Sequence, residues 1–345
     1  MKEKLSLRKI IFALFVANII IRFVISNFPK AMLVYADELI YLNICRSILR
    51  GQIAVHNIPK SFDQILYPLL LTPIMLIKNQ LVGISAISFL NSVLMSSVIF
   101  PVYMLSKKIF DNKIVILLTT ILILFIPDFM STITFMSENL FYPLSVWLFF
   151  TIYNFLDAGS ETKKAVYCSL SSILCFLLYI TKIVSVYFAF AFIIMLIFDI
   201  IITKINTKNQ NIKYCVLFVS LFCILLVVFK LSLLLLDTGN PTYIFRQPEI
   251  DFNRVIYFFY AFTYNSMYAL IAFFYFPIVY TAFRFQQLNQ KEKNIFVFAI
   301  ISLFSAIGII TLTISINEDY PLLNIRQHTR YYAPLLIIFI LLFVK

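Results

Sequence analysis

Apolar runs dominate this sequence, and several of them extend over about 20 residues. A helix of that length crosses a hydrocarbon core that is roughly 30 Å thick. Hydrophobic residues make up 62% of the chain and charged residues 13%, and no Pro/Gly/Ser-rich linker separates one part from another. The sequence therefore predicts an all-α, polytopic membrane protein in which residues 1–345 form a single transmembrane domain.

The positions of lysine and arginine set the predicted topology. The positive-inside rule places the N-terminus in the cytoplasm, because four basic residues flank the first apolar run: Lys2, Lys4, Arg8 and Lys9. No small-residue cleavage site follows this run, so we interpret it as a retained span rather than a signal peptide. About ten spans follow from the whole pattern, over residues 7–25, 84–105, 114–126, 140–155, 166–180, 184–202, 216–236, 268–283, 295–316 and 333–344. Both termini are then cytoplasmic, and we expect a multi-pass protein in the plasma membrane of a prokaryotic cell.

Two longer segments fall on the outer side in this topology, residues 26–80 and residues 237–264. The first contains an apolar stretch that Pro68 and Pro73 interrupt, so we expect juxtamembrane helices there. Counting that stretch as a full span would turn the lysine cluster after the second span outward, against the charge rule. The outer side is therefore where a site is expected.

Charge, cysteine content and glycine content exclude several other classes of protein. The chain carries a formal charge of +12, but its lysines cluster in short loops between apolar runs, so we expect no nucleic-acid partner. The five cysteines form no CxxC motif and lie mostly within apolar runs, which indicates packing rather than a disulfide framework. With five glycines and no P-loop or GxGxxG motif, a glycine-rich nucleotide site is also excluded.

Two adjacent acids, Asp37 and Glu38, lie just beyond the first apolar run, in the segment YADELIYLNICRSILRG. The apolar residues of this segment recur on one stripe and Gly51 stands at the stop position, which predicts one surface helix. One interpretation of the pair is a catalytic or metal-binding carboxylate site. The other is a helix start, because an N-cap Asp accepts backbone N–H groups and an acid in the first turn complements the helix dipole. The two interpretations are compatible, and the pair alone does not decide between them.

Further ionisable residues are expected on the same outer side: Glu138, Lys182, Arg326, His328 and Arg330. Charged residues at membrane depth are costly, which makes them candidates for function. The alternative for Glu138 and Lys182 is interfacial snorkelling or a structural ion pair. Acids and cations that converge on one face can form a site in which a base meets an anionic, phosphate-bearing ligand.

Several motifs follow one another along the chain in the order found in a known family. These are DELIYLNICRSILRG after the first span, LYPLLLTPIML, FLNSVL to YMLSKKIF, FMSENLFYPLSVWLFF, YITKIVSVYFAF and RQHTRYYAPLL. In this order the chain resembles the GT-C superfamily of integral-membrane glycosyltransferases, in the branch of protein O-mannosyltransferases and the aminoarabinose transferase that acts on lipid A. The resemblance covers residues 7–200 and, more loosely, 326–340. Longer members carry a soluble domain after the spans, so a compact member, a piece of a longer chain and a protein with a lipid acceptor stay open.

The resemblance implies an inverting transfer of a sugar from a polyprenyl-phosphate donor to a hydroxyl acceptor in a lipid, glycan or protein. Asp37 matches the acidic base of the superfamily, and such a base takes the acceptor's proton as positive charge develops on the sugar carbon. Glu38 is then expected to orient Asp37, to contact the acceptor or to assist a metal. The expected partners are the lipid-linked donor, the acceptor and membrane lipids.

The same resemblance implies a set of cations for the departing lipid phosphate. Lys182 and Arg330 match basic positions of the superfamily, and Arg326 and Arg246 are supporting candidates. Fixed cations in a site shielded from water stabilise the negative charge that develops on a leaving group. Arginine can do so with two parallel hydrogen bonds and lysine as a point charge.

Other residues are candidate ligand contacts. Four of them are expected to touch the sugar or the acceptor: Glu138, Tyr67, Tyr331 and Tyr332. A divalent metal held by Asp37, Glu38 and His328 stays an open alternative, because imidazole and carboxylate suit several metals while the spacing is not that of a metal motif. No other cofactor is implied.

Two further functions remain alternatives, a transporter or flippase of lipid-linked sugars and a non-catalytic subunit of envelope polysaccharide assembly. Transporters usually contain internal repeats and bind their substrates near the bilayer midplane. We find no repeat, and most of the charges lie at the predicted outer edge. Lys230, within the seventh predicted span, fits a transporter better than an enzyme.

Overall fold

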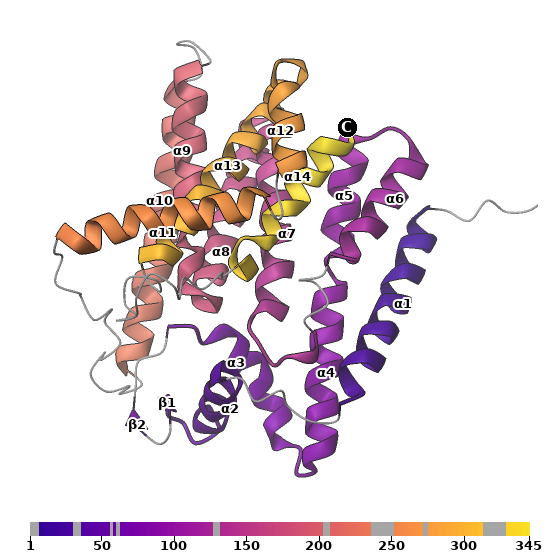
Figure 1. Ribbon diagram of the computed structural model, residues 1–345. Coiled ribbons are helices and arrows are strands. Elements are labelled where there is room, and N and C mark those ends of the chain that lie inside the picture. The colour runs from indigo at the N-terminus through magenta and orange to yellow at the C-terminus, as the bar shows by residue number, and fades with distance from the viewer. Residues whose placement is uncertain are drawn as a thin grey trace, which may run out of the picture. The chain divides into compact units, whose positions relative to one another are not determined.

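The computed structural model describes residues 7–29, 36–55, 58–59, 63–126, 132–202, 208–235, 252–271, 275–312 and 329–345 (Figure 1). These residues are almost entirely helical, which confirms the all-α prediction. Within them, the only extended pairing is a short antiparallel one between β1 (Ala54–Val55) and β2 (Ile58–Pro59). The chain divides into two compact units, and the prediction of a single domain stays a prediction. The first unit consists of Met1–Phe150, Ile180–Lys182 and Leu226–Pro241, and the second of Thr151–Tyr179, Ile183–Leu225 and Thr242–Lys345.

The first unit is built on the N-terminal helices. In chain order these are α1 (Leu7–Asn27), α2 (Ala36–Ile48), α3 (Leu66–Leu71), the 3₁₀ helix η1 (Thr72–Leu76), α4 (Gln80–Ser96), α5 (Ile99–Ile109) and α6 (Lys113–Leu124). Helix α1 lies along α4, and α5 packs against both α6 and α1 (Figure 1). Asn79 and Asn112 cap α4 and α6, since each side-chain oxygen accepts backbone N–H groups of the first turn.

Helix α2 packs on α3 and η1, within the range predicted to hold juxtamembrane helices. Its buried Tyr41, Leu42 and Cys45 belong to one apolar cluster with Tyr67 and Leu71. The helix ends where the sequence predicts, because Gly51 has a φ of 74°, a left-handed conformation that glycine adopts at little cost. The cluster holds the acidic pair's helix against the rest of the first unit.

The second unit contains the later helices. They are α9 (Val186–Ile202), α11 (Phe252–Ala269), α12 (Tyr275–Phe283), α13 (Gln290–Ile310) and α14 (Leu336–Val344), with the 3₁₀ helices η3 (Ile183–Ser185), η5 (Phe285–Gln287), η8 (Thr329–Tyr331) and η9 (Ala333–Leu335). Helix α13 is central, since it packs against α9, α11 and α14, and α12 packs on α14. Three further helices contribute residues to both units, α7 (Glu138–Asp157), α8 (Glu161–Thr181) and α10 (Lys208–Leu235).

Five segments of the described chain are long and apolar enough to cross a membrane: Leu7–Asn27, Gln80–Ile109, Glu161–Thr181, Ile212–Leu233 and Gln290–Ile310. They coincide with the first, second, fifth, seventh and ninth predicted spans, so the chain is a helical membrane protein. The third, sixth and tenth predicted spans correspond to shorter apolar helices. The eighth is divided between α11 and α12, and much of the predicted outer loop 237–264 is helical because α11 begins at Phe252. The structure thus supports fewer full-length spans than ten.

A buried arginine joins three helices of the first unit. Arg22 of α1 is 1% exposed, and its Nε donates to Asn18 Oδ1 at 2.5 Å while Nη2 donates to the carbonyl oxygen of Leu124 at 3.1 Å. Leu124 is the last residue of α6, whose final carbonyls have no partner within that helix. Asn18 Oδ1 also accepts from Ser96 of α4 at 2.8 Å. One guanidinium therefore ties α1 to the end of α6 and, through Asn18, to α4.

We expect Arg22→Met to destabilise the protein by about 1–3 kcal/mol, because the Leu124 carbonyl would be left buried without its donor. Thermal unfolding of the purified protein in detergent measures this. Arg8→Met is the matched control, since Arg8 is an exposed arginine in the first turn of the same helix. Equal midpoints for the two variants would contradict the role given to Arg22.

Candidate active site

Residues 132–137 connect to α7 without continuing its helix, yet most of them are buried. Side chains from other elements bind their backbone groups. The N–H of Phe135 donates to Glu38 Oε1 at 2.7 Å, and the carbonyl oxygen of Thr134 accepts from Asn91 Nδ2 at 3.2 Å and Asn139 Nδ2 at 2.8 Å. Buried backbone groups that lack a helical partner need such hydrogen bonds. The segment is therefore held by α2, α4 and α7 together.

The acidic pair lies in the first turn of α2, as the helix-start interpretation predicts, but the helix already begins at Ala36, so Asp37 is not its N-cap. The catalytic interpretation stays a prediction. The two acids differ in exposure, because Glu38 is fully buried whereas Asp37 is half-buried. One carboxylate oxygen of Glu38 accepts a hydrogen bond from the backbone N–H of Phe135. Asp37 is thus the member of the pair that reaches the surface of this unit, and Glu38 anchors the helix that carries it.

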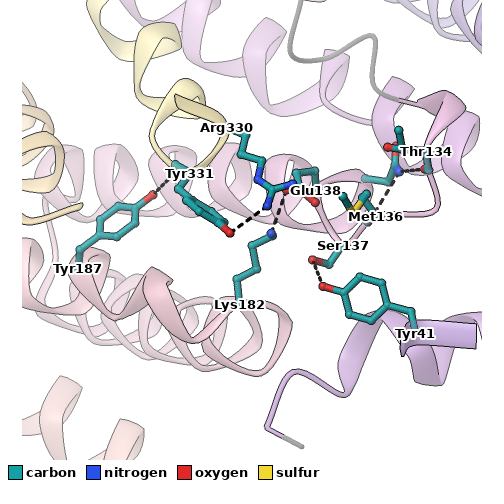
Figure 2. A network of polar contacts seen from close by, with 10 residues as sticks. Tyr41, Thr134, Met136, Ser137, Glu138, Lys182, Tyr187, Arg330 and Tyr331 are labelled. Carbon is teal, nitrogen blue, oxygen red and sulfur yellow. Dashed lines mark hydrogen bonds and ion pairs between the residues drawn. The ribbon is translucent and has the colours of Figure 1, made fainter. Parts of the chain in front are cut away.

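Tyr41, one turn after the pair, connects α2 to the same segment. Its hydroxyl shares a hydrogen bond of 2.9 Å with the Ser137 hydroxyl, as Figure 2 shows. Its ring meets the ring of Tyr67 edge-on at 5.7 Å, and the Tyr67 hydroxyl donates to Asn91 Oδ1 at 3.0 Å. Tyr67 is fully buried in this arrangement, so the structure gives it a packing role, and its predicted contact with a ligand stays a prediction.

Glu138 and Lys182 form a buried ion pair. Lys182 Nζ lies 2.9 Å from Glu138 Oε1, and both side chains are 4% exposed (Figure 2). Glu138 is the first residue of α7, where a negative charge complements the helix dipole, and Lys182 stands between α8 and η3. The structural alternative for these two residues is therefore observed, and a phosphate at Lys182 would compete with Glu138.

Three charges converge around Tyr41. Burial raises the pKa of the Tyr41 hydroxyl to about 12, Lys182 opposes this shift, and Glu138 and Asp37 add to it. The hydroxyl thus remains protonated at neutral pH and can donate or accept a hydrogen bond. Lys182, Glu138 and Asp37 thus all act on one hydroxyl of the first unit. The structure brings together predicted site residues that are distant in the sequence.

Arg330, Tyr331 and Tyr332 belong to the second unit and form a group of their own. The Arg330 guanidinium lies 5.1 Å from the centre of the Tyr331 ring, and its Nη2 donates to the Tyr331 hydroxyl at 3.2 Å. The Tyr331 carbonyl oxygen accepts from the Tyr187 hydroxyl at 2.6 Å, as Figure 2 shows, and Tyr332 is buried. The short helix η8 thereby holds Arg330 against α9.

Several predicted site residues lie outside the described residues: Arg246, Arg326 and His328. The open metal alternative depends on His328 and is therefore not tested. Among the residues that the structure does describe, no group of three or more His, Cys, Asp or Glu side chains is placed to hold a metal ion.

Sequence reasoning missed the polar side chains that organise the site, which are Tyr41, Asn91, Ser137 and Asn139. Asn91 could have been found, because an asparagine within a long apolar run carries the cost of a polar group in lipid and needs a partner. Asn139 directly follows the predicted Glu138. Tyr41 and Ser137 carry no such pattern, since each looks ordinary beside its sequence neighbours.

Lys230 is also bound within the first unit. Its Nζ donates to both carboxylate oxygens of Asp63, at 2.6 and 2.7 Å. Asp63 is 18% exposed and lies just before α3, while Lys230 is 50% exposed near the end of α10. The lysine that seemed out of place in an apolar run therefore has a carboxylate partner in the predicted first outer loop.

Comparison with known proteins assigns no family to this geometry. No protein-family model matches the chain, and no curated protein or solved structure matches it. What the site does must therefore be argued from its own residues.

We expect Lys182→Met alone to cost about 3–5 kcal/mol, because it leaves the Glu138 carboxylate buried without its cation. The double variant Lys182→Met, Glu138→Leu should recover most of that loss, and chemical unfolding of all variants measures the coupling. Lys213→Met is the control, since the Lys213–Glu161 pair is 64% and 60% exposed and should contribute no more than about 1 kcal/mol. Strictly additive effects at 138 and 182 would contradict the pairing.

We expect Glu38→Ala to lose about 1.5–3 kcal/mol, because the Phe135 N–H loses a charged acceptor. Glu38→Gln should lose less, since its amide oxygen can still accept. Asp37→Ala should cost at most about 1 kcal/mol, as expected for one charge in the first turn of a helix. Thermal unfolding of the three variants tests the division between anchor and surface residue, and an Asp37→Ala loss as large as that of Glu38→Ala would refute it.

Proposed function

We propose that the protein is an inverting, GT-C-like glycosyltransferase that moves a sugar from a polyprenyl-phosphate donor to a hydroxyl acceptor. The observation that carries the proposal is the arrangement of charges in the first unit. A half-buried Asp37 stands beside an anchored Glu38, and these acids share one region with the Glu138–Lys182 pair. Such a region offers a base and a cation within one membrane protein, which is what transfer from a lipid phosphate requires.

Asp37 is the proposed base. A hydroxyl acceptor is a poor nucleophile, so a carboxylate that can reach it takes its proton as the bond to the sugar carbon forms and the bond to the phosphate oxygen breaks. Asp37 suits this step because it reaches the surface of the unit, while its neighbour Glu38 fixes the start of α2 through Phe135. Glu38 is thus proposed as a positioning residue.

Lys182 is the proposed cation for the donor phosphate. Glu138 accepts from Lys182 Nζ at 2.9 Å and so holds this side chain in a buried place. A phosphate that enters must share or displace Glu138, so donor binding and the ion pair are linked. Arg330, held by Tyr331, is proposed as a second phosphate ligand. Arg326 and Arg246 as further phosphate ligands, and a metal held by Asp37, Glu38 and His328, remain proposals; Arg246, Arg326 and His328 lie outside the described residues.

The proposal includes the predicted topology, with the N-terminus in the cytoplasm, about ten membrane crossings and the site on the outer face. The short helices α6, α9 and α14 would then cross together with neighbouring segments or at a thinned part of the bilayer. A transporter is the less favoured alternative, because Lys230, the residue that suggested one, has Asp63 as its partner.

Asp37→Asn should reduce sugar transfer by about 10²–10⁴-fold, because the amide cannot take the acceptor's proton. Transfer is measured by incubating the purified protein with candidate polyprenyl-phospho-sugars and with lipid or glycan acceptors. Donor binding should stay unchanged, since the lost group acts on the acceptor. Asp111→Asn is the matched control, because Asp111 is an exposed aspartate in the turn between α5 and α6.

The outcomes separate the candidate functions. Near-normal transfer by Asp37→Asn would remove Asp37 as the base while leaving the enzyme class intact. Translocation of the lipid-linked sugar without transfer, measured in vesicles, would support a transporter. Neither activity with a complete panel of donors and acceptors would support a non-catalytic subunit.

A further inference from the structure

An apolar pocket opens on the second unit beside the turn between α12 and α13. Its volume is about 330 Å³, and it is lined by Ala282, Phe285, Phe296, Val297, Ile300 and Ile301. Small-molecule sites range over roughly 300–1,000 Å³, so this pocket holds a fragment such as part of an acyl chain. Four of the six lining residues belong to α13, within a segment long enough to cross a membrane, so hydrocarbon chains are available there.

Two cationic residues neighbour Phe285, which lines the pocket. Lys293 Nζ lies 5.6 Å from the centre of the Phe285 ring, and Arg284 directly precedes Phe285 in the chain. Arg284 is oriented by neutral groups, because its Nε donates to Gln287 Oε1 at 2.9 Å and its Nη1 to the Tyr280 hydroxyl at 3.1 Å.

The other charges of this turn are neutralised in pairs. Lys291 binds Asp157, and Glu292 binds Lys345 while also closing the capping box with Asn289. Among the described residues, no carboxylate forms an ion pair with Arg284 or Lys293. Two positive charges next to Phe285 therefore have no carboxylate partner within the part of the chain that the structure describes.

We propose that this pocket binds an anionic phospholipid, with an acyl chain against α13 and the phosphate between Arg284 and Lys293. Basic residues at the ends of transmembrane helices bind anionic headgroups, and arginine matches phosphate oxygens with two parallel hydrogen bonds. Charge complementarity selects an anionic lipid over a zwitterionic one, and the apolar walls select a lipid over free phosphate. The pocket shares no residue with the proposed catalytic site, and this inference does not depend on the proposed reaction.

The test uses the full-length protein in a neutral detergent, with phosphatidylglycerol, phosphatidylcholine or inorganic phosphate added at equal concentration. Bound lipid is counted by native mass spectrometry, and the thermal midpoint is measured in parallel. Phosphatidylglycerol should bind and raise the midpoint, whereas phosphatidylcholine and inorganic phosphate should do neither. Added salt should weaken the effect, because the attraction is electrostatic.

The double variant Arg284→Ala, Lys293→Ala should bind phosphatidylglycerol about thirtyfold more weakly, given the contribution of two cations near an anionic headgroup. Lys163→Ala, Lys164→Ala is the matched control, because it removes two charges from the first turn of α8, away from the pocket's lining, and should leave binding unchanged. Ile301→Trp fills the pocket without changing charge and should also weaken binding. Equal binding of the two lipids to the wild type, or equal losses in the pocket and control double variants, would overturn the proposal.

Discussion

The backbone of residues 132–137 imposes the strongest constraint on the first unit. A helix satisfies its own N–H and C=O groups, but a buried segment that leaves the helical conformation must find partners elsewhere. Here those partners are Glu38, Asn91 and Asn139, from three helices that are far apart in the sequence. The position of α2, and with it that of Asp37, follows from this requirement. The irregular segment thus acts as the common support of the acidic pair and the start of α7.

Among the described residues, the buried charges other than Arg22 stand at the ends of helices rather than along their middles. Glu138 begins α7, Lys182 follows α8, and Glu292 lies in the first turn of α13. Each of them has an opposite charge close by, which offsets part of the cost of removing an ion from water. Arg22 is stabilised by a helix dipole instead, because its guanidinium donates to a carbonyl oxygen at the C-terminal end of α6. Helix ends are where such charges find both a partner and a favourable backbone dipole.

Much of the helical pattern could be predicted from hydropathy alone. The starts and ends of α1, α8 and α13 lie within a few residues of the predicted spans, because long apolar runs leave few alternatives. One continuous span was predicted over residues 84–105, where the structure has two helices, α4 and α5. Pro101 favours the break between them. Proline has no N–H to give to the carbonyl of Ser97, and Phe100 N binds that carbonyl instead, at 3.2 Å.

The sequence predicted several residues of the candidate site, but not which residues they contact. Asp37, Glu138 and Lys182 stand out because charges are rare in such a sequence. Their partners do not, since the Lys182–Glu138 bond spans 44 positions and the Phe135–Glu38 bond spans 97. A single sequence carries no pairing information over such separations. The different burial of Asp37 and Glu38 likewise depends on what packs against α2, which periodicity leaves undetermined.

The bond between Lys230 and Asp63 bears on how the chain is assembled in its membrane. A charged residue in an apolar helix costs free energy to insert, so Lys230, near the end of α10, makes this helix harder to insert than its apolar residues alone would. Asp63 precedes Lys230 by 167 positions and is therefore synthesised first. The early carboxylate can therefore receive the late ammonium as α10 inserts, and a chain that lost Asp63 would place α10 less efficiently even with every apolar residue intact.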